Sequence, residues 1–198
     1  FQDVNNMVEK IILASASPRR RLLLEQWGIP FEIMPCDIDE ESMDFPGGPE
    51  IKVEKLALMK AQNVAQKVGN GLVIGADTIV VLDNLILGKP RNDEDAYNML
   101  KKLSGKCHEV LTGIAIVSPE EGVCRTGHEK TRVYFKKISD EEIQAYISTG
   151  EPRDKAGAYA IQGKGALLVE RIEGCYTNIV GLPFALVRRM LKEFGVSM

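Results

Sequence analysis

The sequence predicts an α/β fold built on a mixed β-sheet, and three observations support this. Short apolar runs rich in Val and Ile alternate with segments in which apolar residues recur at helical spacing. Hydrophobic residues make up 44% of the 198 residues, which is enough for a substantial core. No internal repeat or low-complexity linker interrupts the alternation. We therefore expect residues 7–198 to form a single domain, of one or two lobes, and residues 1–6 to be an added or disordered segment.

Composition and charge exclude several classes of function. The 25 basic and 28 acidic residues give a formal net charge of -3, whereas broad nucleic-acid binding requires a basic excess. No apolar run is long enough to span a bilayer and no signal peptide is recognisable, so we expect neither a membrane nor a nucleic acid as partner. The four cysteines lack metal-ligand spacing and are interpreted as reduced thiols. The two histidines, His108 and His128, are interpreted as structural or surface residues.

The stretch from residue 11 to residue 21 is typical of an anion-binding turn. Residues 11–14 are apolar and predict a short buried strand. Ser17 followed by Pro18 predicts a helix start, with serine at the N-cap and proline at the first helical position. Three cations then fall on the first helical turn, where they oppose the helix dipole: Arg19, Arg20 and Arg21. Free N–H groups, serine hydroxyls and guanidinium groups together suit a phosphate. A solvated basic turn is the alternative.

An acidic loop and a long helix come next. Residues 31–35 predict a second strand, and residues 37–41 form an acidic loop that is either solvated or supplies a carboxylate to a metal. Apolar residues at helical spacing predict a helix over residues 49–68. Lys60 adjoins the apolar stripe of this helix, a position from which a lysine usually extends to water.

The strand predicted over residues 72–82 is the most informative one. It is apolar on both faces, as a central strand is, yet Asp77 interrupts it. Because an unpaired buried carboxylate is costly, Asp77 needs a cation, a metal or a catalytic task. A turn at residues 83–84 predicts a hairpin with residues 85–87, and Lys89 follows on a rigid Gly-Lys-Pro loop.

The C-terminal half continues the alternation of helices and strands. Its predicted helices begin after an Asn-Asp-Glu-Asp cap at residues 92–95 and after a capping box that starts at Ser139, and a final helix ends near Phe194. Strands are predicted over residues 107–117, 123–135 and 167–172, and a turn over residues 174–178. Residues 153–166 are rich in Gly and Ala, which lets a ligand approach the backbone closely.

Together these residues indicate metal-assisted attack on a phosphate chain. Carboxylates hold Mg²⁺ or Mn²⁺, and lysines and arginines neutralise an anionic transition state. The residues alone do not determine which bond is broken.

Over residues 11–194 the chain resembles the Maf family of nucleoside triphosphate pyrophosphatases. The resemblance rests on segments in a fixed order, which are Leu-Ala-Ser-Ala-Ser-Pro-Arg-Arg at 13–20, Gly-Ala-Asp-Thr at 75–78, Gly-Lys-Pro at 88–90, Asp-Lys-Ala-Gly-Ala-Tyr at 154–159, Ile-Gln-Gly at 161–163 and Val-Gly-Leu-Pro at 180–183. It implies an inosine-triphosphatase-like fold, with an elongated, twisted mixed sheet flanked by helices and two lobes around a central nucleotide cleft.

The resemblance also implies roles for individual residues. Asp77 would be the general base that activates the attacking water, and with Glu40 it would hold a divalent cation, Mg²⁺ or Mn²⁺. Lys60 and Lys89 would complete the catalytic set by steadying the phosphates. The residues that would bind substrate are Ser15, Arg19 and Arg20 at the triphosphate and Thr78 and Gln162 at the base. Members of this family are cytoplasmic and commonly homodimeric, and we expect both properties here.

Two functions of different classes follow from the resemblance. Gly-Ala-Asp-Thr, with Ala-Tyr-Ala-Ile-Gln-Gly at 158–163, resembles the branch that acts on dTTP and UTP rather than on 7-methyl-GTP. We therefore expect a house-cleaning enzyme that hydrolyses dTTP, UTP and modified pyrimidine nucleotides to the monophosphate and pyrophosphate. The alternative is a nucleotide-binding regulator of septum formation without turnover. Asp77, Lys60 and Lys89 favour the enzyme, since a binder needs no poised base. Ala160 stands where the family has glycine, and adds a methyl group near the pocket.

Overall fold

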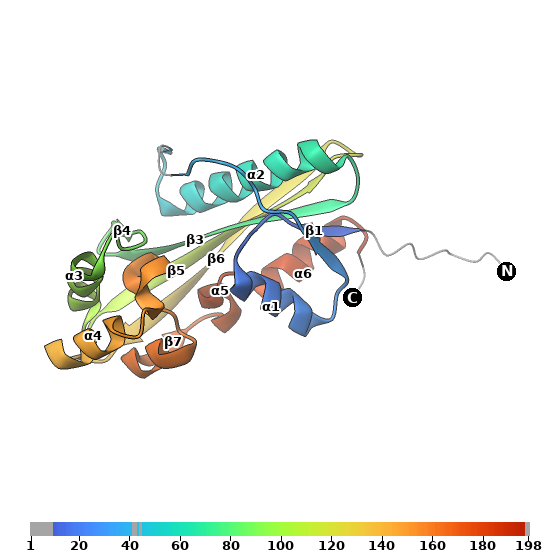
Figure 1. Ribbon diagram of the computed structural model, residues 1–198. Helices are drawn as coiled ribbons and strands as arrows, with labels where there is room; N and C mark the ends of the chain where they lie inside the picture. Colours follow the sequence, from blue (N-terminus) through green and yellow to red (C-terminus); the bar gives the residue numbers. More distant parts are fainter. Residues whose placement is uncertain (1–9, 41–42, 44, 197–198) are drawn as a thin grey trace.

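The computed structural model describes residues 10–40, 43 and 45–196 and shows a mixed α/β fold (Figure 1). The segment 1–6 lies outside the described residues. The strands of the sheet are β1 (Ile11–Leu13), β2 (Phe31–Ile33), β3 (Leu72–Leu82), β4 (Leu85–Leu87), β5 (Cys107–Ser118), β6 (Val123–Phe135) and β7 (Val169–Glu173). Their order is β2-β1-β3-β5-β6-β7, with β4 also beside β3. Strand β1 is parallel to β2 and β3, and the other pairs are antiparallel, so the predicted mixed sheet is confirmed.

Helices cover both faces of this sheet. They are α1 (Pro18–Trp27), α2 (Pro49–Val68), α3 (Asp93–Leu103), α4 (Asp140–Ile147), α5 (Tyr176–Val180) and α6 (Phe184–Glu193), with short 3-10 helices η1 (Glu151–Asp154), η2 (Ala156–Ala158) and η3 (Gly163–Leu168). Helix α2 lies along one face, whereas α1 and α6 lie near one end of the long strands and α3 and α4 near the other (Figure 1). None of the described helices is long and apolar enough to cross a membrane.

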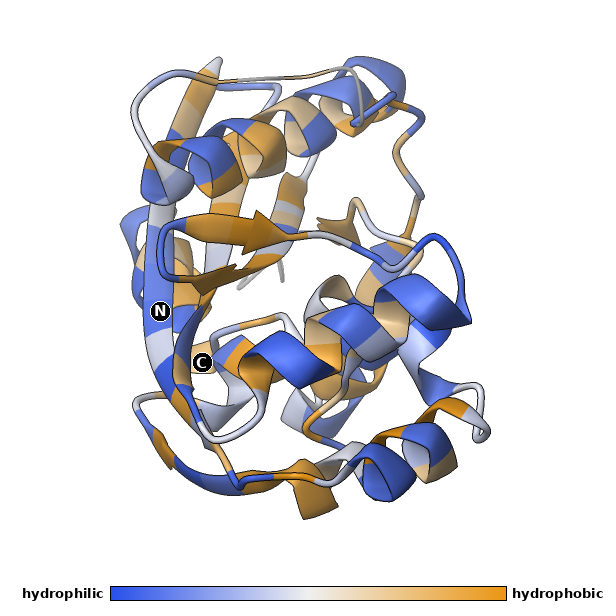
Figure 2. Cartoon of the chain, turned by 90° about the vertical axis from the view of Figure 1, so that its left-hand side faces the viewer, coloured by the Kyte–Doolittle hydropathy of each residue, from blue (hydrophilic) through white to orange (hydrophobic). Residues whose placement is uncertain are grey.

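Side chains of β1 and β3 point alternately to the two faces of the sheet, so they pack against different helices on each face. Ile12 and Val73 pack with the apolar stripe of α2, while Ile11 and Leu72 pack with α1 and α6 on the opposite face. Further along β3, Val80 packs with α3 and α4. Figure 2 shows the hydrophobic residues gathered on the strands that the helices enclose. Thus α1 and α6, and then α3 and α4, cover successive parts of one face.

Helix α2 lies unusually close to the sheet because two glycines face it. A Cβ atom on Gly75 of β3 would lie 2.1 Å from the carbonyl oxygen of Ala57, and one on Gly113 of β5 would lie 2.2 Å from that of Val53. No side chain fits at such distances, so only glycine permits this approach. The consequence is that the side chain of Lys60 on α2 reaches Asp77 in the middle of β3.

Local sequence signals give several elements correctly. The predicted helix over residues 49–68 coincides with α2, and Gly69 ends it with a left-handed φ of 73°. Ser17 accepts a hydrogen bond from the Arg20 N–H at the start of α1, and Ser139 and Glu142 form the predicted capping box of α4. The described cysteines are free thiols, as predicted.

The strand predicted over residues 167–172 begins later, at Val169. The preceding residues form the 3-10 helix η3 instead. Its first N–H groups are bound by a carboxylate from a distant segment, since Glu151 accepts hydrogen bonds from the N–H groups of Lys164 and Gly165 at 3.1 and 3.3 Å. This contact fixes the backbone as a helical turn, and the β-prone residues that follow cannot override it.

The turn predicted over residues 174–178 is also wrong, because residues 176–180 form helix α5. The side chain of Asn178 is fully buried and donates to the carbonyl oxygen of Val110 on β5 and to the hydroxyl of Thr131 on β6, at 3.0 and 2.9 Å. These two bonds hold a helix that is too short to be stable alone.

His108 is structural, as predicted, and gives a test of the core. Burial lowers its pKa to about 4, and its Nε2 lies 2.7 Å from the Tyr159 hydroxyl oxygen. The unfolded chain takes up a proton near the ordinary pKa of 6.5, whereas the native chain takes it up only near pH 4. The contribution of His108 to the free energy of unfolding is therefore fully present above pH 6.5. It is lost as the pH falls toward 4, by about 1.4 kcal/mol per pH unit.

We expect His108→Gln, which keeps a hydrogen-bonding group for Tyr159, to flatten this part of the pH profile. The measurement is urea unfolding of both proteins from pH 7 to pH 4. Parallel profiles for the two proteins would show that His108 does not stay neutral in the native state.

Candidate active site

The predicted residues meet along one edge of β3. On this edge, residues 72–74 pair with β1 and residues 80–82 pair with β4, while β5 pairs with the opposite edge. Residues 75–79 lie between them, and no described strand pairs with that part of the edge. Asp77 and Thr78 belong to this open stretch. Because neighbouring side chains on a strand point to opposite faces, Asp77 faces α2 and Thr78 faces the side of α1.

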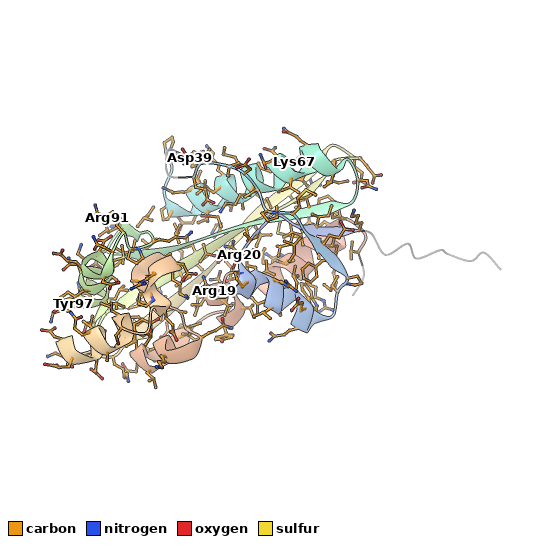
Figure 3. The ribbon with its side chains drawn as sticks, viewed as in Figure 1. Arg19, Arg20, Asp39, Lys67, Arg91 and Tyr97 are labelled. Carbon is orange, nitrogen blue, oxygen red and sulfur yellow. The ribbon has the colours of Figure 1, made fainter. Side chains whose placement is uncertain are left out.

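The turn between β1 and α1 brings hydroxyls and cations to this opening. Ser15 is buried at the end of β1, and its Oγ accepts a hydrogen bond from the Ser17 N–H at 3.2 Å. Pro18 occupies the first turn of α1, which holds no acidic residue. Figure 3 shows Arg19 and Arg20 at this start of the helix. The positive end of the helix dipole and the guanidinium group of Arg20 therefore lie beside Ser15, as an anion site requires.

Arg20 is the best-anchored cation of the site. Its Nε donates to the Gly181 carbonyl oxygen at 2.8 Å, its Nη1 to the Ser15 hydroxyl at 3.2 Å and its Nη2 to the Thr78 hydroxyl at 3.0 Å. Burial lowers the pKa of its guanidinium below the ordinary value, and the negative charge of Asp77 opposes this. A guanidinium has five N–H donors, so two remain for an anion once these three bonds to described residues are counted.

Lys60 connects the two predicted carboxylates. Its Nζ lies 2.8 Å from Asp77 Oδ1 and 3.0 Å from Glu40 Oε1. The Lys60 and Asp77 side chains are 7% and 8% exposed, whereas that of Glu40 is 45% exposed. The expectation that Lys60 extends to water is therefore wrong. Gly75 brings α2 so close to β3 that the ammonium group meets the strand carboxylate instead.

The carboxylates fit a hard divalent cation. Asp77 Oδ2 is buried and has no hydrogen-bond partner among the described residues, so its lone pairs are available to a ligand. Glu40 offers a second, partly exposed carboxylate beside it. No group of three or more potential metal-binding side chains gathers anywhere in the part of the chain that the structure describes. Mg²⁺ is commonly held by one or two carboxylates, with substrate phosphates and water completing its shell, and this donor set has that character.

The other predicted residues, Arg19, Gln162 and Lys89, are described by the structure and make no hydrogen bond or ion pair with the Asp77 carboxylate. Arg19 and Gln162 line a small cavity of about 30 Å³ that residues 159–161 and 179–180 complete. Lys89 is exposed on the loop after β4 and makes no ion pair with a described residue. This loop is tied to η2, since Gly88 accepts a hydrogen bond from the Gly157 N–H at 3.0 Å. The structure thus joins Ser15, Arg20 and Thr78 by hydrogen bonds and Glu40, Lys60 and Asp77 by ion pairs, and leaves Lys89 exposed on its loop.

Two residues that the sequence analysis did not single out belong to the same assembly. Thr112 on β5 lies 2.9 Å from the Thr78 hydroxyl and donates to the Asn178 carbonyl oxygen at 2.9 Å. Both Thr112 and Asn178 are fully buried. Thr112 carries the signal that identified Asp77, a polar residue within an apolar strand. Asn178 carries no local signal, because its segment was predicted as a turn.

Comparisons with known proteins agree with this geometry. The family model described as Maf-like protein matches residues 10–194. A Ruminiclostridium cellulolyticum protein named dTTP/UTP pyrophosphatase is 54% identical over 188 residues, which cover 95% of this chain and 97% of that protein. A Pelotomaculum thermopropionicum protein of the same name is 50% identical over 192 residues, covering 96% and 99%. The solved structure of a HAM1 protein from Coxiella burnetii shares the fold, with a TM-score of 0.55 at 14% identity over 93% of this chain and 99% of that one. The chain therefore belongs to the Maf-like protein family.

Proposed function

We propose that this chain hydrolyses nucleoside triphosphates, chiefly dTTP and UTP, to the nucleoside monophosphate and pyrophosphate. The observation that carries the proposal is the Asp77 carboxylate, which is buried at the open edge of β3, held by Lys60 through one oxygen and without a partner among the described residues at the other. A carboxylate oriented in this way can take a proton from a water molecule. The names of relatives about half identical to this chain support the choice of substrates.

The remaining residues of the site suit a triphosphate. Ser15, the two N–H groups of Arg20 that no described residue accepts and the start of α1 offer donors for phosphate oxygens. Attack at the α-phosphorus forms a bond from the water oxygen to that phosphorus and breaks the bond to the bridging oxygen, so that pyrophosphate leaves with the electron pair. Asp77 accepts the proton of the water, and Lys60 keeps Asp77 in place and balances its charge.

A divalent cation is part of the proposal. Asp77 and Glu40 are the residues that would hold Mg²⁺ or Mn²⁺. Such an ion neutralises charge on the phosphates and promotes deprotonation of bound water. Dependence on the cation is tested by adding a chelator and restoring activity with each metal separately.

The remaining predicted residues, Arg19, Gln162 and Lys89, would contact the base and the distal phosphates. We assign Arg19 and Gln162 to the substrate because they line one cavity, and the exposed Lys89 to the phosphates because of its positive charge. The two groups of helices on one face suit the predicted lobes on either side of a nucleotide. A homodimeric state and a cytoplasmic location stay predictions from the sequence.

A non-catalytic regulator is the weaker candidate. Binding alone would use the arginines and the helix terminus. It would give no reason to bury Asp77 beside Lys60 with one oxygen that no described residue contacts, since burial of charge is costly. The enzyme reading explains these features and the regulator reading does not.

The products give the most direct test. In water enriched in ¹⁸O, with Mg²⁺ or Mn²⁺ and a panel of dTTP, UTP, dCTP and purine nucleoside triphosphates, we expect label in the monophosphate, unlabelled pyrophosphate and the highest kcat/KM for dTTP and UTP. Label in the pyrophosphate would show attack at the β-phosphorus. Release of orthophosphate with a nucleoside diphosphate left behind would contradict the proposal.

A further inference from the structure

A chain of hydrogen bonds runs from Arg20 into the interior of the protein. The Nη2 of Arg20 donates to Thr78, the hydroxyls of Thr78 and Thr112 lie 2.9 Å apart, and Thr112 donates to the carbonyl oxygen of Asn178 at 2.9 Å. The chain thus crosses from α1 over β3 and β5 to α5. Thr112 and Asn178 are fully buried, so water cannot replace these partners without opening the core.

Counting donors and acceptors fixes which group donates in each of these hydrogen bonds. A hydroxyl has one proton, and a carbonyl oxygen can only accept, so the proton of Thr112 is used at Asn178. Thr112 must then accept the proton of Thr78. Thr78 then acts toward Arg20 only as an acceptor, through one of its two lone pairs. Hydrogen bonds ordered in one direction polarise and strengthen one another.

Helix α5 and its C-cap residue accept hydrogen bonds from both Thr112 and Arg20. The carbonyl oxygen of Asn178 that receives the Thr112 proton also receives the N–H of Gly181, which ends the helix. The carbonyl oxygen of Gly181 in turn accepts from Arg20 Nε at 2.8 Å. The Asn178 side chain ties α5 to β5 and β6. Two of the three nitrogens of the guanidinium are therefore positioned from the same rigid helix end.

We infer that Thr78, Thr112 and Asn178 are positioning residues for the phosphate-binding guanidinium of Arg20. The inference rests on the proposed function in that it assigns Arg20 to the phosphates. It also gives Thr78 a role other than selection of the base, which is the role that the family resemblance implies. With its only proton used at Thr112, Thr78 has no hydroxyl hydrogen to give to a nucleobase. The positioning effect that we infer for Thr78 acts through Arg20 and therefore extends to any triphosphate.

Inorganic tripolyphosphate separates these roles because it has no base. We expect Thr112→Val and Thr78→Val each to raise the Kd for Mg²⁺-tripolyphosphate, measured by calorimetry, about three- to tenfold, the range for one lost hydrogen bond. Thr112→Ser keeps the hydroxyl and should restore a Kd within about twofold of the parent protein. In an Arg20→Lys background, which loses the forked donor, Thr112→Val should raise Kd less than twofold further, because the effect acts through the guanidinium.

Ser118→Ala is the matched control, since it removes another buried hydroxyl from β5 at a distance from Arg20. It should leave the tripolyphosphate Kd unchanged. An unchanged Kd in both valine variants, or a full additional loss in the Arg20→Lys background, would overturn the inference. If the parent protein binds tripolyphosphate with this pattern but releases no pyrophosphate from dTTP, the proposed function fails and the positioning role stands.

Discussion

Asp77→Asn is expected to lower kcat by about 10²- to 10⁴-fold, the contribution of a positioned general base. The amide keeps the shape of the side chain and an oxygen for the Lys60 ammonium at the position that now measures 2.8 Å. It removes both the negative charge and the capacity to take a proton from water. Binding of dTTP should weaken far less, because Ser15 and Arg20 do not depend on this carboxylate for their geometry. Pyrophosphate release and nucleotide binding are measured on the same preparation.

The variant should also fold. Lys60 keeps Glu40 as a charged partner at 3.0 Å, so the ammonium group is not left alone. Asp83→Asn is the matched control: it makes the same chemical change on the same hairpin, at an exposed turn residue with φ of 49°, a conformation that asparagine also adopts. It should leave kcat unchanged. An Asp77→Asn protein that melts much earlier yet turns over normally when folded would make Asp77 structural and remove the mechanism.

Local signals in the sequence predict much of this fold, because their physics lies within a few residues. The stripe of apolar residues over 49–68 gives α2 with its bounds, and the serine caps of α1 and α4 are read from three or four consecutive residues. Asp77 could also be singled out, since a carboxylate within an apolar strand is costly wherever that strand lies. These predictions need no knowledge of what packs against the element.

The predictions that failed depend on contacts between distant segments. Helix α5 exists because Asn178 meets Val110 and Thr131 across the sheet, and η3 because Glu151 reaches the backbone of residues 164–165. Lys60 was expected to reach water because spacing along a helix shows the edge of a stripe but not what faces it. The ordered hydroxyl chain of Thr78 and Thr112 depends likewise on the antiparallel register of β3 and β5, which sets these two residues opposite each other.

Lys60→Met is expected to cause the largest loss of stability of any single change in the site. The substitution keeps the length of an unbranched side chain but leaves Asp77, 8% exposed, without its cation. Removing one partner of a buried ion pair typically costs about 3–5 kcal/mol, because the other charge stays desolvated and uncompensated. Glu40 suffers less, since its side chain is 45% exposed and water can solvate it. Urea unfolding at pH 7 measures the change in the free energy of unfolding.

Two further proteins decide whether this loss comes from the uncompensated charge. Adding Asp77→Asn to Lys60→Met removes the stranded carboxylate, so the double variant should recover much of the lost stability, and the two changes should be strongly non-additive. Lys101→Met is the control, because it breaks an ion pair with Asp140 in which both side chains are more than half exposed. The urea concentration at its unfolding midpoint should hardly change. If Lys60→Met unfolds at the same urea concentration as Lys101→Met, the Lys60–Asp77 contact contributes no more than a surface pair, and the strict positioning of Asp77 that hydrolysis requires must come from elsewhere.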